Sequence, residues 1–327
     1  MRLTEPPLLK RGGGLFFNRF NLAFITSAFS RRKVRYNKEE MSNKPIRNVA
    51  IVVRPGSTET IDEGETIQAW LKERGFTSLL TTSDDARLHN GITDGMYDLL
   101  IALGGDGTML RAGHLAAPYG LPVLGINLGR FGFLMQLSRD DWKETIPRLL
   151  TGDYKVENRM MLKAEQWRGE KLLGSYQVIN DVVVCRGHVV RPIRIHAEVD
   201  GYPLAGYVAD GLIAATPTGS TAYALAVGGP IMPPELRNIL IVPVAPHLSL
   251  DRAVILPEGA SVEITADSDH EAVMSVDGHE PALLCNKDRV TVTASDFTVK
   301  FVVFKDPGYF YRNLSNYMEQ NPSIGDI

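Results

Sequence analysis

The sequence predicts an α/β domain with a parallel sheet, followed by a β-rich, sandwich-like domain. Up to about residue 150, short apolar runs alternate with helical patterns, which is typical of parallel strands joined by crossover helices. Beyond about residue 155, strand patterns follow one another with turn residues between them and few helical patterns. A chain of 327 residues is long enough for two such domains. The first domain is therefore expected to be Rossmann-like.

The first domain, residues 46–150, contains three predicted strands and three predicted helices. Apolar runs rich in β-branched residues predict strands over residues 47–53, 97–103 and 121–127. Apolar residues at helical spacing predict helices over residues 58–75, 108–120 and 138–154. Gly75 ends the first helix, Pro118 lies near the end of the second, and Ser138 is the expected cap of the third.

The second domain, residues 151–305, has strand patterns such as "SYQVINDVVVCRG", "SVEITAD", "RVTVTA" and "FTVKFVVF". Within "HAEVDGYPL", Asp200-Gly201 is a strong signal for a two-residue hairpin turn. The tail, residues 306–327, is expected to form a short helix that returns to the α/β domain.

Residues 1–40 differ in composition from the rest of the chain. They hold nine Lys/Arg and three Asp/Glu, with no acidic residue between Glu5 and Glu39. Such a basic, acid-poor stretch is typical of targeting segments, but polar residues interrupt its apolar part too often for a transmembrane helix. Because the first strand follows Met41 almost at once, we favour an extension over residues 1–45 that is disordered or lies upstream of the true start.

Charge and cysteine content exclude some classes of function. The net charge is −3, and without the basic segment, which carries +6, the body of the chain carries −9. An acidic body argues against a nucleic-acid binder that uses a basic surface. Cys185 and Cys285 each lie in an apolar run, so we expect buried free thiols in a reducing, cytoplasmic compartment.

The stretch Gly104-Gly105-Asp106-Gly107-Thr108 lies between a predicted strand and a predicted helix. Ligands bind at this place in open α/β sheets, and glycines let backbone amides approach phosphate oxygens. The lysine of a P-loop is missing, and Asp106 is suited to accept a hydroxyl proton or to hold a metal. The alternative is a tight turn in which Asp106 only caps the helix. Five residues of this kind at one junction favour a phosphate loop.

Two further segments carry polar or glycine-rich patterns. "GINLGRFGF" (125–133) lacks the G-x-G-x-x-G spacing of dehydrogenases, so it is either a functional or a plain glycine-rich loop. Asn180-Asp181 lies inside a strand-like run, where an amide and a carboxylate are costly to bury unless paired. This pair either reads an adenosine edge and its hydroxyls or faces solvent at a strand end.

The segment "ADGLIAATPTGSTAYALAVGGP" (209–230) concentrates hydroxyl side chains at a turn. The residues from Thr216 to Gly219 predict the turn, and Ser220 or Thr221 is expected to cap a helix from Ala222. Hydroxyl side chains, free backbone amides and Tyr223 would then lie together at the start of one helix. This set of groups suits a nucleotide-binding site and is larger than a plain capped helix needs.

Taken together, GGDGT, "INLGRFGFL", "ND", "DGLIAATPTGSTAYALAVGGP" and "SVDG" resemble the NAD kinase family in order and spacing, from about Asn48 to the region of Tyr309. GGDGT alone is shared with diacylglycerol kinases, sphingosine kinases and phosphofructokinases, whereas "TPTGSTAY" is specific. The resemblance implies transfer of a phosphoryl group from ATP, or from polyphosphate in some members, to the adenosine 2′-hydroxyl of NAD. It also implies Mg²⁺ or another divalent cation with ATP, and a homodimer or homotetramer.

The resemblance also implies roles for particular residues. Asp106 corresponds to the family's proton acceptor, and Gly104, Gly105 and Thr108 belong to the phosphate loop. The NAD-binding positions correspond to Asp106, Gly107, Arg111, Asn180, Asp181, Arg191, Val208, Asp210, Thr221, Ala222, Tyr223, Ala224, Leu225, Ala226 and Ala245. The chain departs from the family at Val208, where some members carry a charge, and at His279, where glutamine is common.

Two other functions use parts of this pattern. A non-catalytic NAD(H) sensor would be favoured by loss of the aspartate or of the hydroxyl-rich turn, and neither is lost. A lipid kinase shares GGDGT, but "TPTGSTAY" and the lack of an amphipathic membrane helix in the sequence argue against it.

Overall fold

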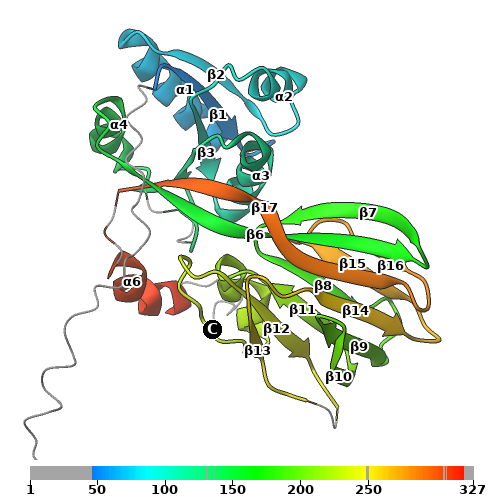
Figure 1. Ribbon diagram of the computed structural model, residues 1–327. Helices are drawn as coiled ribbons and strands as arrows, with labels where there is room; N and C mark the ends of the chain where they lie inside the picture. Colours follow the sequence, from blue (N-terminus) through cyan, green and yellow to red (C-terminus); the bar gives the residue numbers. More distant parts are fainter. Residues whose placement is uncertain are drawn as a thin grey trace, which may run out of the picture. The chain divides into compact units, whose positions relative to one another are not determined.

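The structure is a computed structural model that describes residues 46–129, 132–135, 137–247, 250–304, 306 and 308–319 (Figure 1). The predicted extension over residues 1–45 lies outside the described residues. The described part of the chain forms two β-sheets with helices along the first of them.

Four parallel strands, in the order β2-β1-β3-β4, form the amino-terminal part of the larger sheet. These strands are β1 (Asn48–Val53), β2 (Thr77–Thr82), β3 (Leu99–Gly104) and β4 (Val123–Asn127). The helices are α1 (Thr58–Glu73), α2 (Ala86–Thr93), α3 (Asp106–Ala116) and α4 (Trp142–Leu150). Strands therefore alternate with helices, and the prediction of a parallel α/β sheet is confirmed.

Apolar spacing explains how these elements pack. All six residues of β3 are buried, as expected for a central parallel strand that is covered on both faces. In α1, Ile67 and Leu71 are four residues apart and therefore lie on one face, where both are almost fully buried against the sheet. The Ser57 side chain accepts a hydrogen bond from the Thr60 amide and caps this helix.

Several boundaries differ from those predicted. The strand β2 and the helix α2 were not predicted, because their apolar runs are short. The second helix ends at Ala116, and a 3₁₀ turn over Ala117–Tyr119 contains Pro118, whose missing N–H ends α-helical pairing. Ser138 does not cap α4: it belongs to the short strand β5 (Leu137–Ser138), and its hydroxyl donates to the Asp141 carboxylate at 2.9 Å.

The carboxy-terminal part is an antiparallel β-sandwich, as predicted. One layer continues the large sheet in the order β10-β9-β14-β17, with β6 beside β17 and β7 beside β6. The other layer has the order β13-β12-β11-β8-β15-β16. The first layer consists of β6 (Lys155–Arg168), β7 (Lys171–Val178), β9 (Ile193–Val199), β10 (Tyr202–Ala209), β14 (Val262–Asp267) and β17 (Arg289–Val303). The second consists of β8 (Asp181–Arg186), β11 (Gly211–Ala215), β12 (Asn238–Val244), β13 (Val254–Pro257), β15 (Ala272–Val276) and β16 (Ala282–Leu284).

The period of two along these strands builds the sandwich core. In β9, Ile193, Ile195 and Ala197 are buried and alternate with more exposed residues. The predicted hairpin joins β9 to β10, and both Asp200 (φ 53°) and Gly201 (φ 79°) have the positive φ that such a turn requires.

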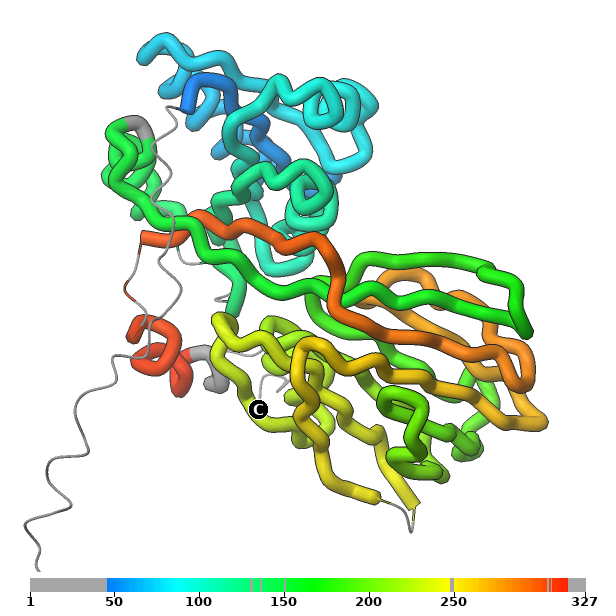
Figure 2. The backbone as a smooth tube through the Cα atoms, in the orientation of Figure 1, coloured from blue at the N-terminus to red at the C-terminus, as the bar shows by residue number. Residues whose placement is uncertain are grey.

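The strand β17 belongs to both parts of the molecule. Its first half pairs antiparallel with β14, and near its end Phe301 pairs with Val123 of the parallel strand β4. Along its other edge β17 pairs with β6, with an irregularity between Ala294 and Thr298 (Figure 2). One sheet therefore runs without a break from the parallel strands into the sandwich.

The tail and the two cysteines test smaller predictions. A helix, α6 (Gly308–Glu319), forms in the tail as expected. Both cysteines are free, but Cys285 is exposed and Cys185 is only partly buried, so the prediction of two buried thiols is wrong. Cys285 directly follows the short edge strand β16, in which only Leu284 is buried. Among the described helices, none combines the length and hydropathy that a membrane crossing requires.

Tyr207 of β10 is buried in the sandwich core, and its hydroxyl has no hydrogen-bond partner among the described residues. Because an unpaired buried hydroxyl costs free energy, Tyr207→Phe is expected to leave the free energy of unfolding unchanged or to raise it by about 1 kcal/mol. Urea unfolding of both proteins measures the difference. A loss of more than about 1 kcal/mol would mean that the hydroxyl has a partner after all.

Candidate functional site

The GGDGT turn lies at the carboxyl end of β3, where open α/β sheets bind ligands. Gly104 has φ +150°, and a Cβ there would lie 2.5 Å from the Thr108 hydroxyl oxygen, so only glycine suits this position. Gly105 is the N-cap of α3. Thr108 is buried, whereas Gly107 is exposed at the start of the helix.

Asp106 does not cap α3, contrary to the alternative interpretation of the turn. Its carboxylate accepts hydrogen bonds from the Phe133 amide (2.9 Å) and the Leu134 amide (3.1 Å). A Cβ on Gly132 would lie 2.3 Å from Asp106 Oδ1, so the second glycine-rich loop approaches Asp106 as only glycine allows. The two glycine-rich segments therefore meet at the Asp106 carboxylate.

Burial raises the pKa of Asp106 above the ordinary value for an aspartate. The two backbone hydrogen bonds and the positive charge of Arg159 act in the opposite direction without cancelling this effect. Arg159 is itself buried, and its Nε donates to Glu157 at 2.8 Å. A carboxylate with a raised pKa is a stronger base, which suits Asp106 to accept a proton.

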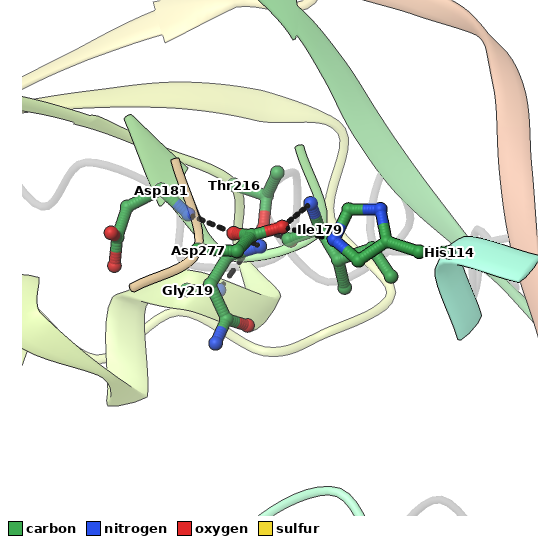
Figure 3. A network of polar contacts seen from close by, with 7 residues as sticks. His114, Ile179, Asp181, Thr216, Gly219 and Asp277 are labelled. Carbon is green, nitrogen blue, oxygen red and sulfur yellow. Dashed lines mark hydrogen bonds and ion pairs between the residues drawn. The ribbon is translucent and has the colours of Figure 1, made fainter. Parts of the chain in front are cut away.

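Asp277 lies at the centre of a polar network (Figure 3). It follows β15, has φ 49°, and its side chain is fully buried. Its carboxylate accepts hydrogen bonds from the backbone amides of Ile179 (2.8 Å), Asn180 (2.7 Å) and Asp181 (3.0 Å). The Asp277 amide donates in return to the Asp181 carbonyl at 2.9 Å. The backbone of the Asn180-Asp181 pair is thus held from both sides.

His114 connects this network to the helix that begins with Asp106. Its Nε2 lies 2.7 Å from Asp277 Oδ2, and its ring lies edge-on to that of His279, with 5.8 Å between centroids. One residue earlier, a Cβ on Gly113 would lie 2.8 Å from the Ile179 side chain. The helix α3 therefore contacts the residues before the Asn180-Asp181 pair directly.

The "TPTG" turn packs against the same backbone. The Thr216 hydroxyl donates to the Ile179 carbonyl at 2.6 Å and accepts from the Gly219 amide at 3.0 Å. A Cβ on Gly219 would lie only 2.0 Å from the Asn180 carbonyl oxygen. Close approach of two backbones is thus the reason for glycine in this motif.

The predicted helix cap at this turn is wrong. Residues Thr218–Thr221 form a 3₁₀ turn, and the helix α5 covers only Tyr223–Ala226, without a side-chain cap. The Ser220 hydroxyl instead donates to the Pro217 carbonyl (2.7 Å) and accepts from the Met232 amide (2.9 Å). The Thr221 hydroxyl donates to the Thr218 carbonyl at 3.0 Å. These hydroxyls therefore stabilise the turn itself, and Ser220 also joins it to Met232.

The Asn180-Asp181 pair presents unusual polar groups. Asn180 Oδ1 is buried and has no hydrogen-bond partner in the described part of the chain, which leaves an acceptor available for a ligand. Burial and the nearby Asp277 charge raise the pKa of Asp181 from 3.8 to about 7, although a Tyr223 backbone hydrogen bond opposes the shift. Asp181 is therefore protonated in part of the molecules near neutral pH.

Asp181→Asn is expected to remove a pH dependence from stability. Because the pKa of Asp181 is raised from 3.8 to about 7, its stabilising contribution is complete below pH 3.8 and is lost as pH rises through 7. Asparagine stays neutral, so the variant should match the wild type at pH 4 and exceed it by on the order of 2–4 kcal/mol at pH 8. Thermal unfolding between pH 4 and pH 8 measures this difference in stability. The same difference between variant and wild type at both pH values would contradict the raised pKa of Asp181.

The predicted positions Val208, Asp210 and Ala245 lie at or near the ends of β10, β11 and β12. Asp210 pairs with Arg186 at 3.1 Å. Burial is the main cause of the raised pKa of Tyr223, and the nearby Cys185, Asp210 and Asp181 raise it further. Ala245 has φ 46°, a strained conformation for alanine of the kind that clusters at functional sites. The turn after it returns to Val208, whose carbonyl accepts from the His247 amide at 2.7 Å.

Other predicted residues are exposed, and the structure does not bring them to this network. Arg111 and Arg191 both point to solvent, and the Arg191 amide donates to the Val189 carbonyl. Of the α5 residues, Ala224 is buried and the others are partly or fully exposed. The roles of these positions remain predictions.

Sequence reasoning missed several residues that the structure places at the site. The roles of His114, Asp277, Arg159 and Thr216 were not predicted. "SVDG" was part of the resemblance, and Asp277 within it was the one signal available. His114 follows Asp106 by eight residues, a spacing that returns to a similar helix face, but nothing in the sequence indicated its partner.

The described residues contain no group of three or more His, Cys, Asp or Glu side chains that could hold a metal ion. Mg²⁺ commonly binds through one or two carboxylates together with substrate phosphates and water. Asp106, the carboxylate of the GGDGT turn, fits that type of donor set.

Parts of both domains match the domains of one known family. Residues 82–154 match the ATP-NAD kinase N-terminal domain, and residues 179–304 match the ATP-NAD kinase C-terminal domain. The NAD kinase of Chloroflexus aurantiacus is 36% identical over 269 residues, covering 82% of this chain and 97% of the relative. That of Heliobacterium modesticaldum is 36% identical over 279 residues, covering 83% and 98%.

Solved structures show the same architecture. Yeast NADH kinase complexed with NADH matches with a TM-score of 0.76 and 25% identity, covering 85% of this chain and 89% of that chain. An NAD kinase from Archaeoglobus fulgidus in complex with ATP shares the fold, with a TM-score of 0.68 and 24% identity, covering 84% and 99%. The motifs, the fold and these matches agree, and the chain belongs to the NAD kinase family.

Proposed function

We propose that this chain transfers a phosphoryl group from ATP, or from polyphosphate, to the adenosine 2′-hydroxyl of NAD and so makes NADP. The observation that carries the proposal is the Asp106 carboxylate, held by the Phe133 and Leu134 amides at the start of α3. Phosphoryl transfer to an alcohol needs a base for the hydroxyl proton, and Asp106 supplies one.

The other groups bind and orient the two substrates. The glycines of the GGDGT turn and the start of α3 offer backbone amides to phosphate oxygens. The free acceptor on Asn180 suits an amino or hydroxyl group of the dinucleotide, and Asp181 lies beside it. Alignment of the hydroxyl with the phosphate is the main catalytic requirement, because little covalent chemistry is left to the protein.

A divalent cation is part of this proposal. When bound with ATP, Mg²⁺ would neutralise charge on the phosphates. Asp106 is the residue of the turn that would face it, and in that position its carboxylate could hold the ion as well as accept the proton.

The direct test is incubation of the protein with NAD, ATP and Mg²⁺, followed by detection of NADP with an NADP-specific dehydrogenase. Polyphosphate in place of ATP tests the alternative donor. Formation of NADP supports the proposal, whereas NAD binding without NADP would favour a non-catalytic sensor. Phosphorylation of diacylglycerol or sphingosine instead would favour a lipid kinase.

We also propose a cytoplasmic homodimer or homotetramer, on the basis of the resemblance and the two free thiols. Light scattering after size exclusion measures the mass, and a monomer would contradict this assignment.

A further inference from the structure

Two elements that must act together meet at His114. The helix α3 carries Asp106 in its first turn and His114 two turns later. The segment 179–181 carries the Asn180-Asp181 pair and leads into β8, which begins at Asp181. In the proposed reaction both elements contact the same dinucleotide, since Asp106 faces its 2′-hydroxyl and the Asn180-Asp181 pair binds the rest of the molecule.

The two elements touch at two neighbouring residues. At Gly113 the helix backbone comes so close to Ile179 that a Cβ would lie 2.8 Å from its side chain. At His114 the imidazole reaches Asp277, whose carboxylate also accepts three amides from residues 179–181. Figure 3 shows the His114 ring directed at this carboxylate.

The Asp277 carboxylate accepts hydrogen bonds from four donors, and the elements that these donors belong to indicate what His114 does. Three donors belong to the segment that Asp277 holds, and only His114 belongs to the helix. Loss of His114 leaves the three amide bonds, so the segment keeps its own conformation. What is lost is the polar link between the segment and α3.

We propose that His114 is a positioning residue: through Asp277 it fixes the Asn180-Asp181 pair relative to Asp106. The proposal rests on the kinase function proposed above. His114 then affects alignment for phosphoryl transfer more than substrate affinity, because misplacement by about 1 Å can cost two orders of magnitude in rate.

The test compares two amides of different reach. In His114→Gln the side-chain Nε2 extends about as far from Cβ as the imidazole Nε2, so it can still donate to Asp277. In His114→Asn the amide is one methylene shorter and falls short. We expect His114→Gln to keep kcat within about 3-fold of the wild type. His114→Asn should lose about 10- to 100-fold in kcat, with KM for NAD and for ATP within about 3-fold.

Hydrogen exchange gives a readout that does not depend on activity. In His114→Asn the amides of residues 179–181 should stay protected, whereas exchange in α3 around His114 should rise. A remote core variant, Ile146→Val in α4, serves as the control for general loss of stability, since Ile146 is fully buried but contacts neither element of the link.

The outcomes separate the possible roles. Equal kcat for His114→Asn and the wild type overturns the proposal, as does a rise in KM for NAD at constant kcat, which would place His114 on the substrate. Equal losses of kcat in His114→Gln and His114→Asn also overturn the proposal, because the distance that the side-chain amide reaches toward Asp277 would then not matter. If the wild type makes no NADP, the kinase function fails, and the exchange measurement still decides whether His114 links the two elements.

Discussion

Asp106→Asn is expected to lower kcat by about 10²–10⁴-fold, because the amide cannot accept the proton of the attacking hydroxyl. Burial raises the pKa of Asp106 and so makes its carboxylate a better base. To act as a base, the side chain must also be deprotonated before the reaction. Wild-type activity should therefore fall on acidification at a pH above the ordinary titration range of aspartate. The residual turnover of Asp106→Asn should not show this fall on acidification.

The structure also predicts a modest loss of stability in Asp106→Asn. Both carboxylate oxygens accept backbone amides, and an asparagine NH₂ would face one of these donors. One lost hydrogen bond costs about 1–2 kcal/mol, which thermal unfolding detects and which is too small to unfold a domain. A kcat near the wild-type value would rule out any catalytic role.

Titration with Mg²⁺ separates the two roles of Asp106. If the carboxylate mainly holds the cation, high Mg²⁺ should restore part of the turnover of Asp106→Asn. A missing base cannot be replaced in this way, so an unchanged defect at saturating Mg²⁺ assigns proton transfer to Asp106.

Gly219→Ala is expected to disrupt the dinucleotide site and to destabilise the protein. The new Cβ would lie 2.0 Å from the Asn180 carbonyl oxygen and 2.4 Å from its carbon, so one of two backbones must move. Overpacking of this kind costs about 3 kcal/mol. Because Asn180 moves with its backbone, KM for NAD should rise at least 10-fold, while KM for ATP changes less.

Gly259→Ala is the matched control for this substitution. A Cβ on Gly259 meets nothing within 4 Å, and the residue lies in the connection between β13 and β14. The control should keep both its melting temperature and its KM for NAD. If Gly219→Ala also keeps its melting temperature and its KM for NAD, the backbones of Gly219 and Asn180 do not approach each other this closely.

Much of the fold was predictable because burial imposes a period on the sequence. The fully apolar run of β3 and the alternation along β9 each identify a strand and its surroundings. The short segment of β2 carries too few apolar residues to give such a signal, and the end of α3 depended on the local effect of Pro118. Boundaries therefore failed where local chemistry outweighs periodicity.

The candidate site was predictable only where local motifs carry it. The steric reason for Gly104 is Thr108 of the same motif, whereas Gly219 was identified by its own motif but owes its residue type to the backbone of Asn180 in another segment. Asp106 was singled out for its residue type, but its true partners are the amides of residues 133 and 134, which no local pattern identifies. The link between His114 and Asp277 spans 163 residues, and such pairing depends on the tertiary fold.

The position of β17 has a consequence for synthesis of the protein on the ribosome. This strand lies between β4 and β14 in the sheet, yet it is the last strand of the described chain to be made. Until residues 289–303 emerge, β6 lacks its longest partner and β4 lacks its contact at Val123. The nascent chain thus exposes unpaired strand edges, which are prone to associate with other chains, until its final strand is inserted.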